Sequence, residues 1–341
     1  MSTSLETIKA TQVRFVKEAK AIPGRDTWAF THDQVRLPGD GEIVVKMHYL
    51  SIDPAMKGWI TKKRSYIEPV ELGDVMRGFG VAEVIESRSN YYSVGDYCTG
   101  FTGIQTHGTY SDRALRKVDG GLAPLSNFMS GLGMPGFTAY FGLLDIGKPK
   151  AGETVVVSSA AGAVGHVVCQ IAKLKGCRVV AIAGGPEKCQ YLKDHGMDEV
   201  IDYRKVDIGE ALNAAAPQGI DVYFDGVGGE TLDAVLARIN RHARLVICGA
   251  VSQYGDMHNI KGPSNYFQLI AQSGLMQGFT MRDYMHRIKE AATDLLTWKR
   301  EGKITFREHV MEGIENFPVA VQMIFKGENQ GKLMLKVSED E

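Results

Sequence analysis

Apolar and polar residues alternate in short runs over the first third of the chain. From about residue 12 to residue 125, runs rich in β-branched residues, such as 41–49 (GEIVVKMHY) and 80–85 (GVAEVI), are separated by turn sequences such as PGDG at 38–41. Many short strands with frequent turns are typical of a β-barrel or β-sandwich. We therefore predict such a structure for this region, with one short helix at 53–59.

From residue 134 onward, strand-like apolar runs alternate with runs of helical periodicity. Residues 134–144 (MPGFTAYFGLL) are interpreted as a buried helix that leads into the first of these strands. The alternation predicts an α/β fold with a parallel, doubly wound sheet. We expect strands at 154–157, 179–182, 199–203, 221–224, 244–248 and 275–279, and helices at 164–174, 187–194, 231–239, 265–272 and 282–300.

The tail changes character again. A strand is expected at 303–310, a helix at 317–325 and a final strand at 332–337, and we expect this tail to return to the first domain. The predicted domains are therefore residues 1–130 completed by 302–341, and residues 131–301. The last four residues, 338–341 (SEDE), are expected to be disordered.

A strand, a turn of small residues, a helix and a second strand follow one another between residues 154 and 183. The turn reads AAGAVG, a variant of the glycine-rich pattern in which Ala160 replaces the first glycine. In such a unit the backbone of the turn can approach a pyrophosphate, and the helix N-terminus offers free N–H groups. Glycines alone can simply mark a tight turn, but the strand and the helix on its two sides favour dinucleotide binding.

The residues after the second strand distinguish NAD from NADP. An NAD site usually has an acidic residue there, which binds the ribose 2′-hydroxyl. This chain has Gly184, Gly185, Pro186, Glu187 and Lys188 instead. A lysine in the first turn of a helix opposes the helix dipole unless it binds an anion, and a 2′-phosphate is such an anion. We predict NADP, against the alternative of a solvated lysine partly offset by Glu187.

The composition is that of an ordinary globular protein of two domains, with 341 residues, 44% of them hydrophobic, and a formal net charge of −1. Because no basic stripe is present, nucleic acid is not expected as a partner. No apolar run approaches the roughly 20 residues of a membrane span, and the polar N-terminus lacks a signal-peptide core. The five cysteines form no CxxC pair, so we expect no disulfide and a reducing, cytoplasmic location.

Longer stretches of sequence indicate a family. They are LSIDPAMKGW at 50–59, residues 133–165, QIAKLKGCRVV, FDGVGGE, CGAVSQY and GENQGK. Over nearly the whole chain they resemble the zinc-independent, NADPH-dependent double-bond reductases of the medium-chain dehydrogenase/reductase superfamily. The resemblance implies a GroES-like β-barrel catalytic domain, a Rossmann domain that binds NADP, and a homodimer. The dimer would pair the apolar run at 275–281, which lacks the charges of a protected free edge.

Zinc-using relatives carry cysteine, histidine and carboxylate ligands in their first domain. The corresponding stretches here, SIDPAM and GDVMRGFG, contain neither cysteine nor histidine, and we interpret His48 and His107 as ordinary barrel or loop residues. No metal is therefore expected, and a zinc-type alcohol dehydrogenase reaction is disfavoured.

The resemblance also implies which residues hold the cofactor. The glycine-rich turn would line the pyrophosphate, Lys188 and Tyr203 the 2′-phosphate, and later loops the nicotinamide. Asn329 would reach the cofactor from the tail, and Gly226 replaces an asparagine common in relatives. The complete set is Gly162, Ala163, Val164, Gly165, Lys188, Tyr203, Gly226, Cys248, Gly249, Ala250, Val251, Ser252, Gln253, Tyr254, Phe279, Thr280, Met281 and Asn329.

The implied reaction reduces the carbon–carbon double bond of a medium-sized α,β-unsaturated ketone or aldehyde, with hydride added to the β-carbon. A donor that stabilises the enolate oxygen lowers the barrier, and Tyr254 is our catalytic candidate beside the nicotinamide ribose hydroxyl. Tyr254 could instead be only a wall of the cofactor pocket. Ala55 stands where several relatives have a tyrosine thought to touch substrate, and Tyr66 could enter the same cleft. A quinone reductase and a non-catalytic NADPH-binding protein are the alternative functions.

Overall fold

The structure, a computed structural model, describes residues 8–257 and 259–338. Its contacts divide the chain into two compact units. Unit 1 takes the chain as far as Met129 and also includes His309–Glu328 and the residues from Leu333 onward. Unit 2 consists of Ser130–Glu308 and the short segment Asn329–Lys332. Each unit therefore combines pieces that are distant in the sequence.

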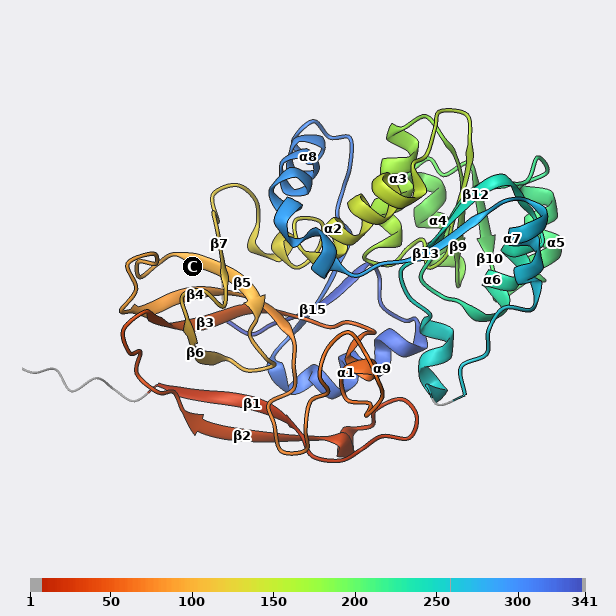
Figure 1. The fold of residues 1–341 in the computed structure, drawn as a ribbon. Coiled ribbons are helices and arrows are strands. Elements are labelled where there is room, and N and C mark those ends of the chain that lie inside the picture. The colour runs from red at the N-terminus through yellow and green to blue at the C-terminus, as the bar shows by residue number, and fades with distance from the viewer. Residues whose placement is uncertain (1–7, 258, 339–341) are drawn as a thin grey trace, which may run out of the picture. The chain divides into compact units, whose positions relative to one another are not determined.

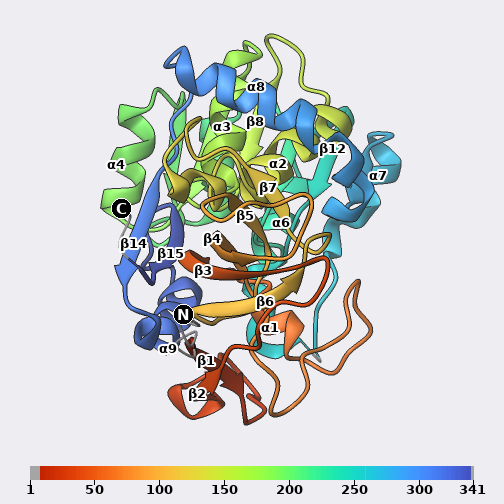
Figure 2. The ribbon, with the colours of Figure 1, turned by 90° about the vertical axis from the view of Figure 1, so that its left-hand side faces the viewer.

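Unit 1 is built around β3 (Glu42–Ser51), a strand that is buried along most of its length. It pairs antiparallel with β4, β6 and β15. Figure 2 shows the tail strands β14 and β15 in blue, with β15 next to β3. The sheet runs in the order β14-β15-β3-β4-β5-β7, with β6 paired to β3; these strands are β4 (Phe79–Ser87), β5 (Tyr97–Phe101), β6 (His107–Ser111), β7 (Arg116–Val118), β14 (Glu308–Glu312) and β15 (Lys332–Lys336).

The tail also supplies part of the unit 1 core. The ring of Phe317, at the start of α9 (Phe317–Lys326), packs edge-on against Trp28 with 5.1 Å between centroids. Trp28 begins β2 (Trp28–Gln34), which pairs only with β1 (Lys9–Phe15) among the described strands. The remaining helical turns of this unit are η1 (Arg25–Thr27), α1 (Met56–Trp59), η2 (Leu125–Phe128) and η7 (Ile314–Asn316).

Two predictions about the tail can be compared with the structure. The strand expected at 303–310 begins only at Glu308, because the Thr305 N–H donates to the side-chain oxygen of Gln170 (2.8 Å) instead of joining a strand ladder. Residues 339–341 of the segment expected to be disordered lie outside the described residues. Ser338 is described, and its Oγ donates to the Met47 carbonyl at 2.8 Å.

Unit 2 contains the parallel sheet, coloured green to blue in Figure 1. All its strand pairs are parallel, in the order β10-β9-β8-β11-β12-β13. This order places the first strand of the unit beside the fourth, so that the topology reverses between β8 and β11, which is where doubly wound sheets bind ligands. The strands are β8 (Thr154–Val157), β9 (Arg178–Ala183), β10 (Glu199–Asp202), β11 (Ile220–Asp225), β12 (Ile239–Ile247) and β13 (Leu275–Gly278).

The helices of unit 2 differ from the predicted ones at several places. The helix α5 was not predicted, although Asp207 caps it by accepting the Glu210 N–H. The helix expected at 231–239 ends at Leu236, because Ile239 already pairs with Ile220 in the sheet. The helices are α2 (Met134–Phe141), η3 (Gly142–Gly147), α3 (Gly165–Leu174), α4 (Pro186–Asp194), α5 (Ile208–Ala215), α6 (Gly229–Leu236), η4 (Val251–Asp256), η5 (Ser264–Tyr266), α7 (Phe267–Ala271), η6 (Met281–Arg287) and α8 (Ile288–Arg300).

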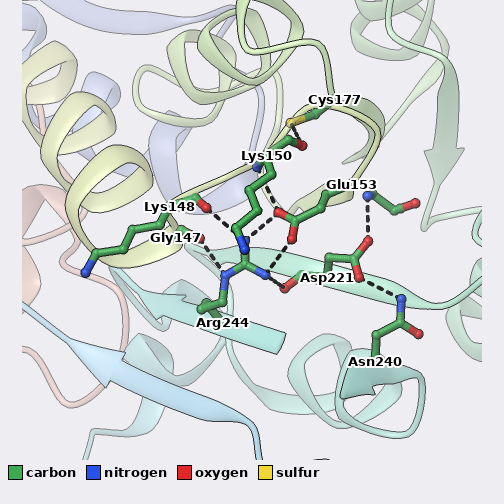
Figure 3. Close-up of polar contacts among 9 residues, drawn as sticks. Gly147, Lys148, Lys150, Glu153, Cys177, Asp221, Asn240 and Arg244 are labelled. Atoms are coloured by element: carbon green, nitrogen blue, oxygen red, sulfur yellow. Dashed lines mark hydrogen bonds and ion pairs between the residues drawn. The ribbon is translucent and has the colours of Figure 1, made fainter. Parts of the chain in front are cut away.

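One arginine ties together the amino ends of three neighbouring strands (Figure 3). Arg244 of β12 donates to the carbonyls of Gly147, Lys148 and Asp221 and makes two bonds to the Glu153 carboxylate, which precedes β8. Burial favours the neutral form of Glu153, but the bonds from Arg244 and from the Lys150 N–H, together with the charges of both residues, hold the pKa of this carboxyl below its usual range. This end of the sheet is therefore closed by paired charges.

Candidate functional site

The loop after β8 is shaped by close backbone contacts that glycine permits. Ser159 has a positive φ of 50° and turns its carbonyl toward the start of α3. A methyl group at Gly165 would lie 2.4 Å from that carbonyl oxygen, and one at Gly162 would lie 3.0 Å from it. Ala160 takes the place of the first glycine of the pattern, with its N–H bonded to the Ile182 carbonyl at 3.0 Å. The turn of Gly162, Ala163, Val164 and Gly165 thus brings bare backbone to a helix N-terminus, which fits a pyrophosphate.

A buried carboxylate connects the two loops at the topological switch point. Asp225, the last residue of β11, is fully buried, and its Oδ1 accepts bonds from Ser158 Oγ, Tyr223 Oη and the N–H groups of Val227 and Gly228 at 2.9–3.1 Å. Ser158 Oγ in turn accepts the Gly226 N–H (2.9 Å). The loop after β8 and the loop after β11 are therefore held as one piece. Sequence reasoning singled out FDGVGGE but missed this role of its aspartate.

Gly226 is not required by its surroundings. A methyl group there would lie no closer than 3.8 Å to a neighbouring atom, which is ordinary van der Waals contact. A methyl group therefore fits at this position without displacing a neighbouring atom.

The loop after β12 packs onto the same two loops. The N–H groups of Cys248 and Gly249 both bond to the Asp225 carbonyl, and Ser252 bonds through its backbone and hydroxyl to the Val227 carbonyl. Ala250 and Val251 lead into η4, which contains Gln253 and Tyr254. Desolvation and the Asp225 carboxylate raise the pKa of the Cys248 thiol to about 12, so this cysteine stays a neutral thiol at neutral pH.

Tyr254 turns back over this loop. Its side chain is half-buried, and its hydroxyl would lie 3.5 Å from a methyl group placed on Gly249. A phenol hydroxyl is therefore held at the carboxyl edge of the sheet, beside the loop that follows β12.

Phe279, Thr280 and Met281 follow β13 and are all half-buried. The ring of Phe279 packs against Gly142, where a methyl group would lie 2.7 Å from its Cζ. The contact with η3 thus fixes an aromatic ring at this end of the sheet.

The two residues predicted to bind a 2′-phosphate lie at one turn. The Gly184–Gly185 turn joins β9 to α4, and the Tyr203 ring lies against it, 2.7 Å from where a Cβ on Gly184 would be. Lys188 is half-buried in the first turn of α4. Burial, reinforced by the positive charges of Arg204 and Arg307, lowers the pKa of Lys188. Neither arginine was predicted from the sequence.

The short tail segment Asn329–Lys332 lies at the glycine-rich turn after β8. Gly331 forms a parallel bridge with Gly162, and the Asn329 side chain donates to the Gly331 carbonyl at 2.7 Å. Gly331 has a φ of 79°, and a methyl group there would lie 2.2 Å from the Arg307 carbonyl oxygen. Asn329 therefore shapes the segment that approaches the turn, and sequence reasoning missed Gly331.

The two histidines of unit 1 that were considered as metal ligands have other partners. His48 is buried 3.3 Å from a Glu83 oxygen, and His107 contacts the Thr106 hydroxyl at 3.1 Å. Among the residues that the structure describes, no group of three or more histidine, cysteine or acidic side chains is arranged to hold a metal ion. Within the same described ranges, no helix is long and apolar enough to cross a membrane.

Tyr66 and Ala55 also lie in unit 1. Tyr66 is about half exposed, and its hydroxyl accepts a bond from Trp59 Nε1 at 3.1 Å. Ala55 precedes α1 and presents only a methyl group. The side chain at position 55 therefore carries no hydroxyl, whereas Tyr66 offers one nearby in sequence.

Comparison with known proteins agrees with this geometry. Residues 11–118 match a family model described as the N-terminal domain of oxidoreductase, and residues 163–298 match one described as zinc-binding dehydrogenase. The chain is 42% identical to the NADPH-dependent curcumin reductase of Escherichia coli strain K12, over 94% of both chains. It is 43% identical to prostaglandin reductase 1 of Bos taurus, over 87% of this chain and 90% of the relative.

A solved structure agrees as closely. The crystal structure of CurA from Vibrio vulnificus in complex with NADPH superposes with a TM-score of 0.92 at 40% identity, covering 97% of this chain and all of that one. The likeness extends over both units, and the relatives are named as reductases, one of them NADPH-dependent and one solved in complex with NADPH. This chain belongs to the zinc-independent double-bond reductases of the medium-chain dehydrogenase/reductase superfamily.

Proposed function

We propose that this protein catalyses the NADPH-dependent reduction of the carbon–carbon double bond of α,β-unsaturated ketones and aldehydes. The observation that carries the proposal is a cofactor cradle with two distinct ends, both in unit 2. One end is the bare turn at Gly162 and Gly165, which fits a pyrophosphate. The other is the cationic turn at Lys188, which fits a 2′-phosphate. NADPH held in this way supplies the hydride.

Different residues would bind different parts of the cofactor. Ala163, Val164 and Gly165 would donate N–H groups to the pyrophosphate, while Lys188 and Tyr203 would bind the 2′-phosphate. Gly162, whose own N–H donates to the Ser159 carbonyl at 2.9 Å, would let the pyrophosphate approach the turn closely. Asn329 keeps Gly331 against the turn. The loops after β11, β12 and β13 carry the dinucleotide toward the nicotinamide; they contribute Gly226, then Cys248, Gly249, Ala250, Val251, Ser252 and Gln253, and finally Phe279, Thr280 and Met281.

Tyr254 would act on the substrate. Negative charge develops on the carbonyl oxygen as the β-carbon is reduced, and a positioned phenol can donate a hydrogen bond to that oxygen. Its place beside Gly249 at the carboxyl edge of the sheet supports this role. The Y254F variant should lower kcat by about 10²–10³, as loss of one oxyanion donor does, with NADPH affinity unchanged. A kcat close to that of the wild type would leave Tyr254 as a wall of the pocket.

Product analysis tests the reaction itself. NADPH oxidation is followed with a small panel of enones, enals and quinones, and the organic products are identified by mass spectrometry. A saturated carbonyl compound supports the proposal, and an allylic alcohol overturns it. Turnover of quinones alone would assign a quinone reductase, and binding of NADPH without turnover of any panel member would assign a non-catalytic role.

The two units would have separate tasks, with unit 2 binding the cofactor and unit 1 serving as the catalytic GroES-like domain.

The five cysteines are free thiols, four of them buried, which suits a cytoplasmic location.

We also propose a homodimer formed through the free edge of β13. All four residues of β13 are exposed, including Leu275 and Met276, and α7 beside it exposes Phe267 and Ile270 at 64% and 70%. An uncharged strand edge next to such an apolar helix is unprotected against pairing. Sedimentation at micromolar concentration should give a dimer, and I270D should give a monomer with an unchanged circular dichroism spectrum. A wild-type monomer would contradict the proposal.

A further inference from the structure

Arg307 is a largely buried cation whose partners do not use all of its donors. It lies in unit 2, one residue before β14, and its side chain is 15% exposed. Its guanidinium stacks 3.8 Å from the centre of the Tyr191 ring, and its Nη2 lies 3.9 Å from a carboxylate oxygen of Glu187. Its Nη1 is buried without a hydrogen-bond partner among the described residues. A buried guanidinium N–H in this state favours an anionic ligand.

Arg204 approaches the same turn from β10. Its backbone N–H bonds to the Asp202 carboxylate (3.2 Å), and that carboxylate also accepts the Gly185 N–H at 2.9 Å. Its side chain lies along the turn, so that its Nε would be 2.9 Å from a Cβ on Gly184. The Asp202 carboxylate thus fixes the turn at Gly185 and the backbone of Arg204, whose side chain lines the turn.

The backbone around Arg307 is held by the segment that also reaches the phosphate-binding turn. Lys332 N–H donates to the Arg307 carbonyl at 2.8 Å, and the preceding residue, Gly331, bridges to Gly162. Arg307 is therefore positioned from the same short segment that contacts the pyrophosphate end of the cradle. Three cations, Lys188, Arg204 and Arg307, meet at this turn. The two arginines lower the pKa of Lys188, and the Glu187 carboxylate raises it.

We propose that Arg204 and Arg307 complete a three-cation pocket with Lys188 for the 2′-phosphate of NADPH, and that Arg307 contributes its unpaired Nη1 to that phosphate. This inference rests on the proposed placement of the cofactor. A phosphate monoester carries close to two negative charges and three acceptor oxygens, which match the number and the sign of these side chains. Guanidinium groups also bind phosphate in a fixed geometry that a lysine does not offer.

Calorimetric titration with two small probes tests the pocket without catalysis. The probe 2′,5′-ADP carries the 2′-phosphate, and 5′-AMP lacks it. The variants are R307M, R204M and K188M, each of which removes a charge and retains a long apolar chain. Lys205, the exposed neighbour of Arg204, provides the matched control K205M.

Each of the three pocket variants should weaken 2′,5′-ADP binding about 10- to 100-fold, the value of one charge-assisted hydrogen bond. Binding of 5′-AMP and of NADH should change less than about 2-fold, and K205M should bind both probes like the wild type. If K188M loses the preference for 2′,5′-ADP while R204M and R307M keep it, the three-cation pocket is wrong and the cofactor placement stands. If no variant changes the preference, the placement of the 2′-phosphate at this turn is wrong as well.

A variant with the opposite expected sign separates binding from misfolding. E187Q removes the carboxylate that pairs with Arg307, so 2′,5′-ADP should bind about 2- to 5-fold more tightly, the range of one exposed ion pair. Damage to the fold cannot tighten binding. Unchanged or weaker binding by E187Q would overturn the role of Arg307.

Discussion

The two ends of the parallel sheet in unit 2 use arginine in opposite ways. At the amino end, Arg244 makes five hydrogen bonds, two of them to the Glu153 carboxylate, and all its acceptors belong to the protein (Figure 3). At the carboxyl end, Arg307 has one acidic neighbour at 3.9 Å and a buried Nη1 with no partner among the described residues. The first arginine therefore contributes to folding, whereas the second is positioned for a ligand. The partners of a cation, more than its burial, distinguish these two tasks.

The largest expected effect is at the amino end. R244M should lower the free energy of unfolding by about 3 kcal/mol, because it leaves the Glu153 carboxylate buried without its cation. Urea denaturation followed by circular dichroism measures this loss. The NADPH affinity of the folded protein should be nearly unchanged, and R307M should show the reverse pattern. A comparable loss of stability in both variants would break the contrast between the two ends.

The carboxyl end should show its own dependence on pH. His166, near the start of α3, is buried, and burial lowers its pKa from 6.5 to about 4. The unfolded chain then binds a proton that the folded chain excludes, so stability falls as the pH drops from 6.5 toward 4, by about 3 kcal/mol in total. H166Q should abolish this slope in urea denaturation between pH 7 and pH 4. A slope equal to that of the wild type would assign the acid sensitivity to other groups.

Two lysines at opposite ends of the sheet sharpen the comparison. K188A should raise the Michaelis constant for NADPH about 10- to 100-fold, through loss of a charge-assisted hydrogen bond, and should leave NADH binding nearly unchanged. K150A, at the amino end, should change neither, because the Lys150 bonds in the network come from its backbone. Steady-state kinetics with both cofactors measures the effect. An equal loss for NADPH and NADH in K188A would contradict the phosphate assignment.

Two glycines give the smallest and most local test. G165A places a methyl group 2.4 Å from the Ser159 carbonyl oxygen, whereas the nearest atom to a methyl group in G226A is 3.8 Å away. We expect G165A to cost about 2 kcal/mol of stability through overpacking and to weaken NADPH binding, and G226A to be tolerated. Thermal unfolding with and without NADPH compares the pair. Equal behaviour of the two variants would show that the turn is not shaped by this contact.

Much of the fold was predictable because its signals are local. The strands of unit 2 were predicted from apolar runs, and the helix starting at Pro186 from its position after a strand and a glycine turn. Ile239 was misassigned because an apolar residue at the end of a helical pattern can equally begin a strand, and only its pairing with Ile220 decides between the two. The helix α5 carried a capping signal at Asp207 that was not used.

The candidate site was predictable only in part, for a physical reason. Lys188 was found because a cation in the first turn of a helix is locally unfavourable, and this is visible in a few residues. Arg307 and Gly331 lie in the same region although they are more than 100 residues away from Lys188 in the sequence, so no local sequence pattern predicts their role. Asp225 lay within a recognised stretch, but the four donors to its one oxygen come from two different loops and from Tyr223 of its own strand.

The four residues Asn329–Lys332 have a consequence for anyone who recombines this protein with a relative. They belong to unit 2 although the residues on both sides of them belong to unit 1, and they contact Gly162 and Arg307 through their backbone. A hybrid that exchanges residues 130–308 alone would combine one parent's glycine-rich turn with the other parent's tail segment. Transplanting the cofactor half intact requires two exchanged pieces, the long one and these four residues.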